Sequence, residues 1–276
     1  MRWSDLRQSR NIEDRRGFGG RGVAVGGGGI GILVLAVAIY LCGGDPTQLF
    51  QGGIPQGEAP VPSAASNSTA GTQDTNRQFA GAIIGSLEDM WREVLPQQAR
   101  IKLREPQLVL FTGQVSSACG YASAATGPFY CPGDQKLYLD FAFFDELRRE
   151  FKAPGDFAQA YVIAHEYGHH VQNLTGMMDK VQSVGQDNRL SVALELQADC
   201  YAGIWANHAQ KQGRLDAGDP AEALRAAAAV GDDMIQKRTQ GHVIPDSFTH
   251  GSSQQRMEWF LKGMKSGDMR QCQTLR

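Results

Sequence analysis

Apolar residues recur at helical spacing in one stretch about a third of the way along the chain. Six of them follow a period near 3.6 residues and predict a helix that Pro96 ends. They are Phe79, Ile83, Leu87, Met90, Trp91 and Val94. Further helices are expected over 144–151, from Asp156 as N-cap to about Gly176, and over 190–212, 220–238 and 253–264.

Two shorter stretches, 108–115 and 129–141, favour β-strands, and within the second the segment 136–140 alternates polar and apolar residues. The predicted fold class is therefore α+β: a mostly helical domain with a small β-sheet just before the helix at 156–176. No Gly-rich phosphate-binding loop follows either strand, so a nucleotide site of that type is not indicated.

The N-terminal region divides by charge. Residues 1–21 hold six arginines against three acidic residues, whereas 22–44 carry no charge and are strongly apolar over 30–42. About 20 apolar residues cross a bilayer, and arginines stay in the cytoplasm. We therefore expect 1–21 to be a cytoplasmic N-terminus, 22–44 a single-pass transmembrane anchor, and the remainder to lie across the membrane. A cleaved signal peptide is the alternative, but the residues from Cys42 to Pro46 form a poor cleavage site.

Composition then separates a tether from a domain. Residues 45–76 are rich in Pro, Gly, Ser, Thr, Ala and Gln, which predicts a flexible linker, and 77–276 are expected to form the folded domain. The whole chain has a formal net charge of −2. A charge so close to balance gives no basic excess, so we expect no nucleic-acid partner.

The cysteines outside the predicted anchor number four. In an oxidising compartment they favour disulfides. Cys119 and Cys131 flank a short segment that could close as a hairpin, which leaves Cys200 for Cys272 by elimination. Four cysteines allow three connectivities, and free buried thiols are a further alternative.

The strongest chemical signal is the segment His165-Glu166-Tyr167-Gly168-His169. Histidines four residues apart project from one face of a helix and can share one metal ion. Glu166 lies beside that face, where it can reach a water rather than the metal. Zinc activates such a water, and Glu166 would take its proton and pass it to a leaving amine.

A catalytic zinc ion usually has three protein ligands. Glu195, on the helix expected over 190–212, is the candidate third ligand, and Asp199 lies one turn later on the same face. Asp199 can accept a hydrogen bond from a ligand imidazole and fix its orientation. The apolar sequence around both acids makes a solvated acidic face the weaker alternative. One zinc ion per chain is predicted; two His and one Glu would also accept cobalt or nickel.

These motifs resemble those of known peptidases. HEYGH followed by ELQAD resembles the gluzincin metallopeptidases, and the segments 127–132 and 134–140 with HEYGHHVQN look like the neutral zinc metallopeptidase family of bacteria. The resemblance covers essentially the whole chain. It implies a zincin-like fold and, with the predicted anchor, an inner-membrane protein whose catalytic domain is periplasmic.

The same resemblance suggests three further roles. Thr249-His250-Gly251 with Arg256 is similar to the Thr-His-Pro…Arg element of related gluzincins, with Gly251 in place of Pro. His250 would then stabilise an oxyanion and Arg256 would brace the carboxylate of Asp199, although a loop and helix with solvated polar groups is an equal alternative. In zincins the strand before the active-site helix receives the substrate as an added strand. Here its residues would be Lys136, Leu137, Tyr138 and Leu139.

The predicted function is hydrolysis of peptide bonds in periplasmic or membrane-proximal polypeptides. One alternative is a binding or scaffold protein that keeps zinc for stability alone, and a second is zinc-dependent hydrolysis of another bond, such as a peptidoglycan amide. Glu166 favours an enzyme, because a closed structural zinc site has no need of that carboxylate. Neither the substrate nor the oligomeric state follows from the sequence.

Overall fold

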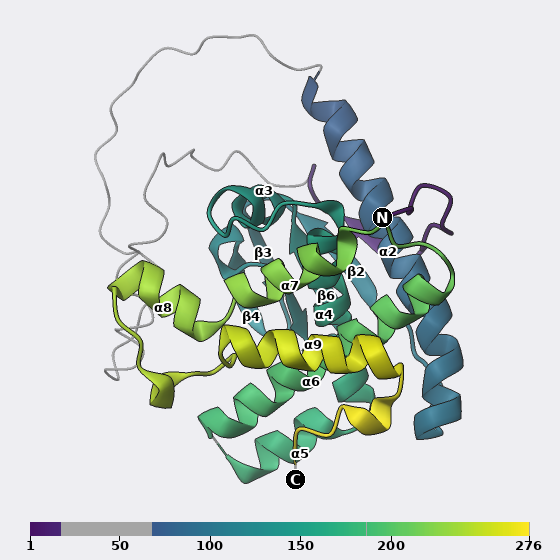
Figure 1. Ribbon diagram of the computed structural model, residues 1–276. Coiled ribbons are helices and arrows are strands. Elements are labelled where there is room, and N and C mark those ends of the chain that lie inside the picture. Colours follow the sequence, from purple (N-terminus) through teal and green to yellow (C-terminus); the bar gives the residue numbers. More distant parts are fainter. Residues whose placement is uncertain (18–67, 186, 276) are drawn as a thin grey trace, which may run out of the picture. The chain divides into compact units, whose positions relative to one another are not determined.

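The computed structural model describes residues 1–17, 68–185 and 187–275. They form a mostly helical α+β fold, which confirms the predicted fold class (Figure 1). The helices are α2 (Ser68–Ala99), α3 (Ala142–Arg149), α4 (Asp156–Leu174), α5 (Met177–Val184), α6 (Asn188–Lys211), α7 (Asp219–Ala229), α8 (Asp232–Gln240) and α9 (Ser253–Ser266). The strands are β1 (Ile12–Asp14), β2 (Gln107–Phe111), β3 (Gln114–Ser117), β4 (Gly120–Ser123), β5 (Phe129–Cys131) and β6 (Lys136–Asp140).

The predicted anchor at 22–44 and most of the predicted linker lie outside the described residues. Within the part of the chain that is described, none of the helices combines the length and the apolar character that a membrane span needs.

A four-stranded sheet with the order β1-β2-β6-β5 is the centre of the fold. β1, β2 and β6 run parallel, and β5 is antiparallel to β6. Strand residues alternate between two apolar layers, because successive side chains point to opposite faces. Leu108 and Leu137, which are register partners, enter the main core among the helices. Val109 and its partner Tyr138 enter a smaller core that includes Val115 of the β3–β4 hairpin.

Four helices form the helical layer that holds the functional residues. α4 contacts α6 and α7, and α6 packs closely along α9, the helix drawn in yellow in Figure 1. Large side chains such as Phe157, Tyr161, Trp205 and Phe260 are fully buried between these helices. Such dense packing fixes the rotamers of neighbouring polar side chains.

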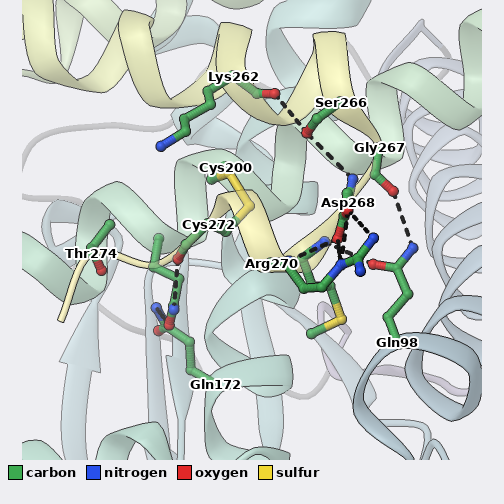
Figure 2. The surroundings of a disulfide bond; sticks show 12 residues. Gln98, Gln172, Cys200, Lys262, Ser266, Gly267, Asp268, Arg270, Cys272 and Thr274 are labelled. Carbon is green, nitrogen blue, oxygen red and sulfur yellow. Dashed lines mark hydrogen bonds and ion pairs between the residues drawn. A yellow bond between two sulfur atoms is a disulfide. The ribbon is translucent and has the colours of Figure 1, made fainter. Parts of the chain in front are cut away.

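Both cysteine pairs expected from the sequence are present as disulfides. Cys119–Cys131 joins the turn between β3 and β4 to β5, and Cys200–Cys272 joins α6 to the C-terminal residues (Figure 2). Two disulfides in one domain favour an extracytoplasmic location.

The N-terminal residues belong to the folded domain, which the sequence did not predict. β1 extends the sheet by pairing with β2. Trp3 makes an edge-to-face contact with Phe79 of α2, with ring centroids 5.3 Å apart. The α-ammonium group of Met1 donates a hydrogen bond of 2.8 Å to Asp156 at the start of α4. The described N-terminal residues therefore group with Asn76–Arg276 in one compact unit.

A buried carboxylate explains part of this docking. Glu88 of α2 is 0% exposed and accepts hydrogen bonds from Arg7 (2.7 Å), Ser9 (2.6 Å) and Asn11 (2.8 Å). A carboxylate without such partners is costly to bury. The residues around 7–11 therefore satisfy a charge that would otherwise be stranded in the domain.

This arrangement corrects the predicted separation of 1–21 from a domain at 77–276. A segment that packs against the domain cannot stand on the opposite side of a membrane from it. A single pass between residues 17 and 68, with a cytoplasmic N-terminus and a periplasmic domain, is therefore incompatible with the described packing. The arginine excess was misleading because Arg7 and Arg16 form ion pairs with acidic residues of the same unit.

Several element boundaries also differ from the prediction. α2 begins at Ser68, inside the predicted linker, and Pro96 lies within its last turn rather than ending it. The helix expected over 220–238 is divided into α7 and α8 near Gly231, and α5 was not predicted. The strand expected over 129–141 is interrupted by a turn, which separates β5 from β6.

Candidate metal centre

Helix α4 presents the two histidines of the HEYGH segment side by side. Most of α4 is buried, because Phe157, Tyr161 and Val171 pack into the core. His165 and His169 are one helical turn apart, and their ring centroids lie 4.8 Å from each other. Their side chains are 8% and 13% exposed, so both rings are largely shielded from water.

Glu195 of α6 brings a carboxylate to the same point. Its Oε2 lies 3.1 Å from Nε2 of His165, and its Oε1 lies 3.4 Å from Nε2 of His169. One ligand atom from each of the three residues falls within 4.8 Å of the other two. Two imidazole nitrogens and one carboxylate oxygen are the donor set of a catalytic zinc site that keeps a coordination position open. The residues present therefore fit a zinc ion.

The second predicted carboxylate, Asp199, holds the ring of His165. Nδ1 of His165 lies 2.9 Å from Oδ1 of Asp199, and Arg256 donates to both carboxylate oxygens at 2.8 and 3.0 Å. Burial would raise the pKa of Asp199, but the charge of Arg256 and the hydrogen bonds hold that pKa below its ordinary value. A charged Asp199 keeps His165 oriented with Nε2 toward Glu195.

Tyr161 completes this buried group, although the sequence analysis did not select it. Its hydroxyl donates to Oδ1 of Asp199 and accepts a hydrogen bond of 3.3 Å from Arg256. Tyr161 lies four residues before His165, so it shares the same face of α4. That spacing is a signal that could have identified it.

The second histidine is held by an amide chain that the sequence analysis also missed. Nδ1 of His169 lies 2.8 Å from Oε1 of Gln172, whose Nε2 donates to the carbonyl of Leu194 and to Gln197. Gln197 in turn donates to the carbonyl of Cys272 at 2.9 Å. Figure 2 shows Gln172 near the Cys200–Cys272 disulfide. The C-terminal residues are thus connected to a candidate ligand through two buried amides.

Glu166 follows His165 directly and is partly exposed beside the three donor residues. Burial raises the pKa of its carboxyl group above the ordinary value. A carboxylate with a raised pKa is a better proton acceptor near neutral pH. Its position and chemistry suit a general base.

His250 lies in the loop between α8 and α9 and is anchored by Asp232, a residue that the sequence analysis did not select. Oδ2 of Asp232 accepts hydrogen bonds from three successive backbone N–H groups, those of residues 249–251, at 2.8, 2.6 and 2.9 Å. Its Oδ1 lies 3.0 Å from Nδ1 of His250. This hydrogen bond and the charge of Glu195 raise the pKa of His250 despite partial burial.

The conformation of the loop favours glycine at position 251, where the similar gluzincin element would place proline. Gly251 has φ +90°, whereas the proline ring restricts φ to about −65°. Half of the His250 side chain is exposed (51%). His250 is thus held by Asp232, which favours its cationic form, while half of its side chain remains open to a ligand.

The predicted substrate strand requires a correction. Lys136, Leu137, Tyr138 and Leu139 belong to β6, which pairs with β2 on one side and β5 on the other. β2 covers one edge of β6 throughout, and β5 covers the other edge over Lys136, Leu137 and Tyr138, so these three residues cannot receive an added strand. β5 is the outer strand on this side of the sheet, and among the described residues no strand pairs with its free edge. Local sequence pattern does not reveal which strand of a sheet is outermost.

His170 lies away from the three candidate ligands. Its Nε2 donates to the carbonyl of Arg104 at 2.6 Å, and its Nδ1 is 3.1 Å from the hydroxyl of Tyr130. Burial lowers the pKa of His170 to about 4. It is a neutral side chain in a hydrogen-bonded position at the sheet.

Comparisons with known proteins agree with this centre. A family model described as "Putative neutral zinc metallopeptidase" matches residues 1–275. "Uncharacterized protein YpfJ" of Escherichia coli is 42% identical over 286 residues, covering 99% of this chain and 98% of that relative. "Uncharacterized protein Rv2575" of Mycobacterium tuberculosis is 44% identical over 216 residues, covering 73% of this chain and 72% of that relative. No solved structure gives a significant match.

Proposed function

Because this chain belongs to the neutral zinc metallopeptidase family, we propose that it is a zinc-dependent endopeptidase that cleaves extracytoplasmic polypeptides. One observation carries the proposal: donor atoms of His165, His169 and Glu195 converge from two helices, with Glu166 next to them. A site built only for stability has no use for a free carboxylate of this kind.

Glu166 accounts for the proton that passes from the attacking water to the leaving amine, while the other proton of the water stays on the new carboxyl group. A zinc ion held by the three donors supplies a Lewis acid that polarises the scissile carbonyl and activates water. Glu166 accepts a proton from the attacking water as the new C–O bond forms. It then gives that proton to the amine nitrogen as the C–N bond breaks.

Negative charge develops on the carbonyl oxygen during this attack. His250 is a donor whose cationic form is favoured by Asp232, and we propose that it stabilises this oxyanion. Arg256 keeps Asp199 charged and His165 oriented, and its Nη2 also lies 3.7 Å from Oε2 of Glu195.

We propose that β5 aligns the substrate, in place of β6. An extended peptide could add to the free edge of Phe129–Cys131 through backbone hydrogen bonds. β5 contacts α4, the helix that carries both histidines, which supports this assignment.

For location, we propose that the disulfide-bonded unit stands in the periplasm, with residues 1–17 on the same side. We also propose that residues 22–44 attach the protein to the inner membrane. This proposal does not include a single transmembrane pass. Introduced cysteines at Arg10, which is exposed, and Ser116 of the β3–β4 hairpin should react alike with a membrane-impermeant thiol reagent in intact spheroplasts. Reaction at only one of the two positions would contradict the same-side arrangement.

The peptidase is tested with the full chain, because a fragment that begins near residue 75 would lack β1 and the partners of Glu88. Wild type and Glu166→Gln are loaded to equal zinc content and incubated with an unfolded protein. Cleavage by the wild type alone supports the proposal. Equal cleavage by both would indicate a contaminant and refute the role of Glu166. No cleavage by either, with one zinc bound to each, would favour the zinc-stabilised scaffold.

A further inference from the structure

A directional chain of hydrogen bonds joins α4 to the outer strand β5. Nε2 of His170 must donate, because its partner at 2.6 Å is the carbonyl oxygen of Arg104. In a neutral imidazole the other nitrogen, Nδ1, then accepts, and it does so from the hydroxyl of Tyr130 at 3.1 Å. The same hydroxyl accepts from Nδ2 of Asn173 at 2.9 Å. The order of donation is therefore Asn173 to Tyr130 to His170 to Arg104.

The two central members of this series of hydrogen bonds are buried. His170 is 1% exposed and Tyr130 is 8% exposed. The two rings also make an edge-to-face contact, with centroids 5.4 Å apart. Both ring nitrogens of His170 and the hydroxyl of Tyr130 have partners, so a lost hydrogen bond would leave a buried group unsatisfied.

This series of hydrogen bonds holds β5, which is a short strand. β5 has three residues, and it pairs with β6 on one side only. Phe129 stacks on Tyr138 at 4.7 Å between ring centroids, and Cys131 is fixed by its disulfide to Cys119. Tyr130 points to the opposite face of the strand, where His170 holds its hydroxyl. Both faces of β5 are therefore anchored while its outer edge stays free of another strand among the described residues.

We propose that His170 is a positioning residue. Through Tyr130 it fixes the position of β5 along α4, so that a peptide bound to β5 lies next to His169. This inference rests on the proposed peptidase function and identifies what sets the substrate strand in place. His170 follows His169 on α4, so a displacement of β5 relative to His170 is a displacement relative to the metal centre. Pre-organisation of a short strand lowers the ordering cost of binding a peptide to it.

Two substitutions at His170 separate its two hydrogen bonds. His170→Asn keeps an acceptor near the position of Nδ1 but loses the donor to Arg104. His170→Gln keeps a donor near the position of Nε2 but loses the acceptor for Tyr130. Tyr130→Phe removes the hydroxyl itself. Tyr167→Phe is the matched control, because Tyr167 is also buried on α4 but its hydroxyl has no hydrogen-bond partner.

The variants are made in the full chain and compared on an extended peptide and on a short blocked dipeptide substrate. We expect Tyr130→Phe and His170→Gln to raise KM for the extended peptide about two- to tenfold, the effect of one hydrogen bond, with kcat nearly unchanged. The dipeptide, which is too short to span β5, should be cleaved as by the wild type. His170→Asn should recover most of the loss. Equal effects on both substrates, or effects no larger than in Tyr167→Phe, would overturn the proposal.

A second measurement separates this proposal from the peptidase itself. Backbone amide exchange of Phe129 and Cys131 should be faster in Tyr130→Phe than in Tyr167→Phe, at equal zinc content. If the wild type cleaves nothing, the peptidase proposal fails, but faster amide exchange in Tyr130→Phe would still support the positioning of β5 by His170. Unchanged amide exchange in Tyr130→Phe would refute this positioning, whatever the activity.

Discussion

Replacing Gly85 by alanine tests whether the N-terminal residues lie where the structure places them. Gly85 is in the middle of α2, and a Cβ added there would lie 2.1 Å from the carbonyl oxygen of Arg7 and 3.3 Å from the backbone nitrogen of Ser9. The first contact is with backbone and is far too short, so residues 7–9 would have to move away.

The informative quantity is the sign of the change that Gly85→Ala causes in the free energy of unfolding. Alanine in a helix interior is about 1 kcal/mol more favourable than glycine, so an undocked α2 would become more stable. In the docked structure the change displaces Arg7 and Ser9 from Glu88, which is 0% exposed. Removing the partner of a buried charge costs about 3–5 kcal/mol. Subtracting the helix gain predicts a net loss of about 2–4 kcal/mol.

Equilibrium urea unfolding of the full chain, with both disulfides intact, measures this free energy. Gly81→Ala is the control on the same helix. A Cβ at Gly81 would meet Oε1 of Gln8 at 2.4 Å, which is the end of a flexible side chain that can turn aside. The control should therefore be close to neutral or slightly stabilising. If Gly85→Ala also stabilises the protein by about 1 kcal/mol, the N-terminal residues do not lie against α2.

Three further changes test the metal centre. In the presence of a chelator, Arg256→Met should lower the free energy of unfolding by about 3–5 kcal/mol, and by much less when Asp199→Asn is already present. Equal losses with and without Asp199→Asn would show that the two side chains are not coupled. Zinc should raise the Tm of the wild type, and removal of zinc should reverse that gain, whereas Glu195→Gln should respond far less; the same response in both would exclude Glu195 as a ligand. Because Asp232 raises the pKa of His250, Asp232→Asn should move the alkaline limb of the pH profile of kcat/KM to lower pH, and an unmoved limb would show that the proton of His250 is not used.

Spacing along single helices made much of the centre predictable. His165 and His169 are one turn apart on α4, and Glu195 and Asp199 are one turn apart on α6, so local periodicity placed each pair on one face. The structure brings these two pairs together and adds Arg256, which the family resemblance had suggested. The cysteine pairs could also be predicted from the sequence, because four cysteines allow only three connectivities.

Contacts between distant segments were not predictable in this way. β1 is three residues long and has no signal of its own until it meets β2, about a hundred residues later. The identity of the outer strand depends on the order of strands across the sheet rather than along the chain. Asp232 likewise acts on a loop more than ten residues away, through three backbone N–H groups that any sequence would supply.

The position of Arg256 in the chain bears on when the centre becomes complete during synthesis. His165, His169 and Glu195 all precede it, and Arg256 follows His165 by 91 residues. A nascent chain that ends before α9 can hold the three donors, but Asp199 lacks the cation that keeps it charged. Cys272, whose carbonyl supports Gln197 and through it Gln172, is made later still. Chains that stop before Arg256 therefore lack the support of His165, and chains that stop before Cys272 also lack part of the support of His169.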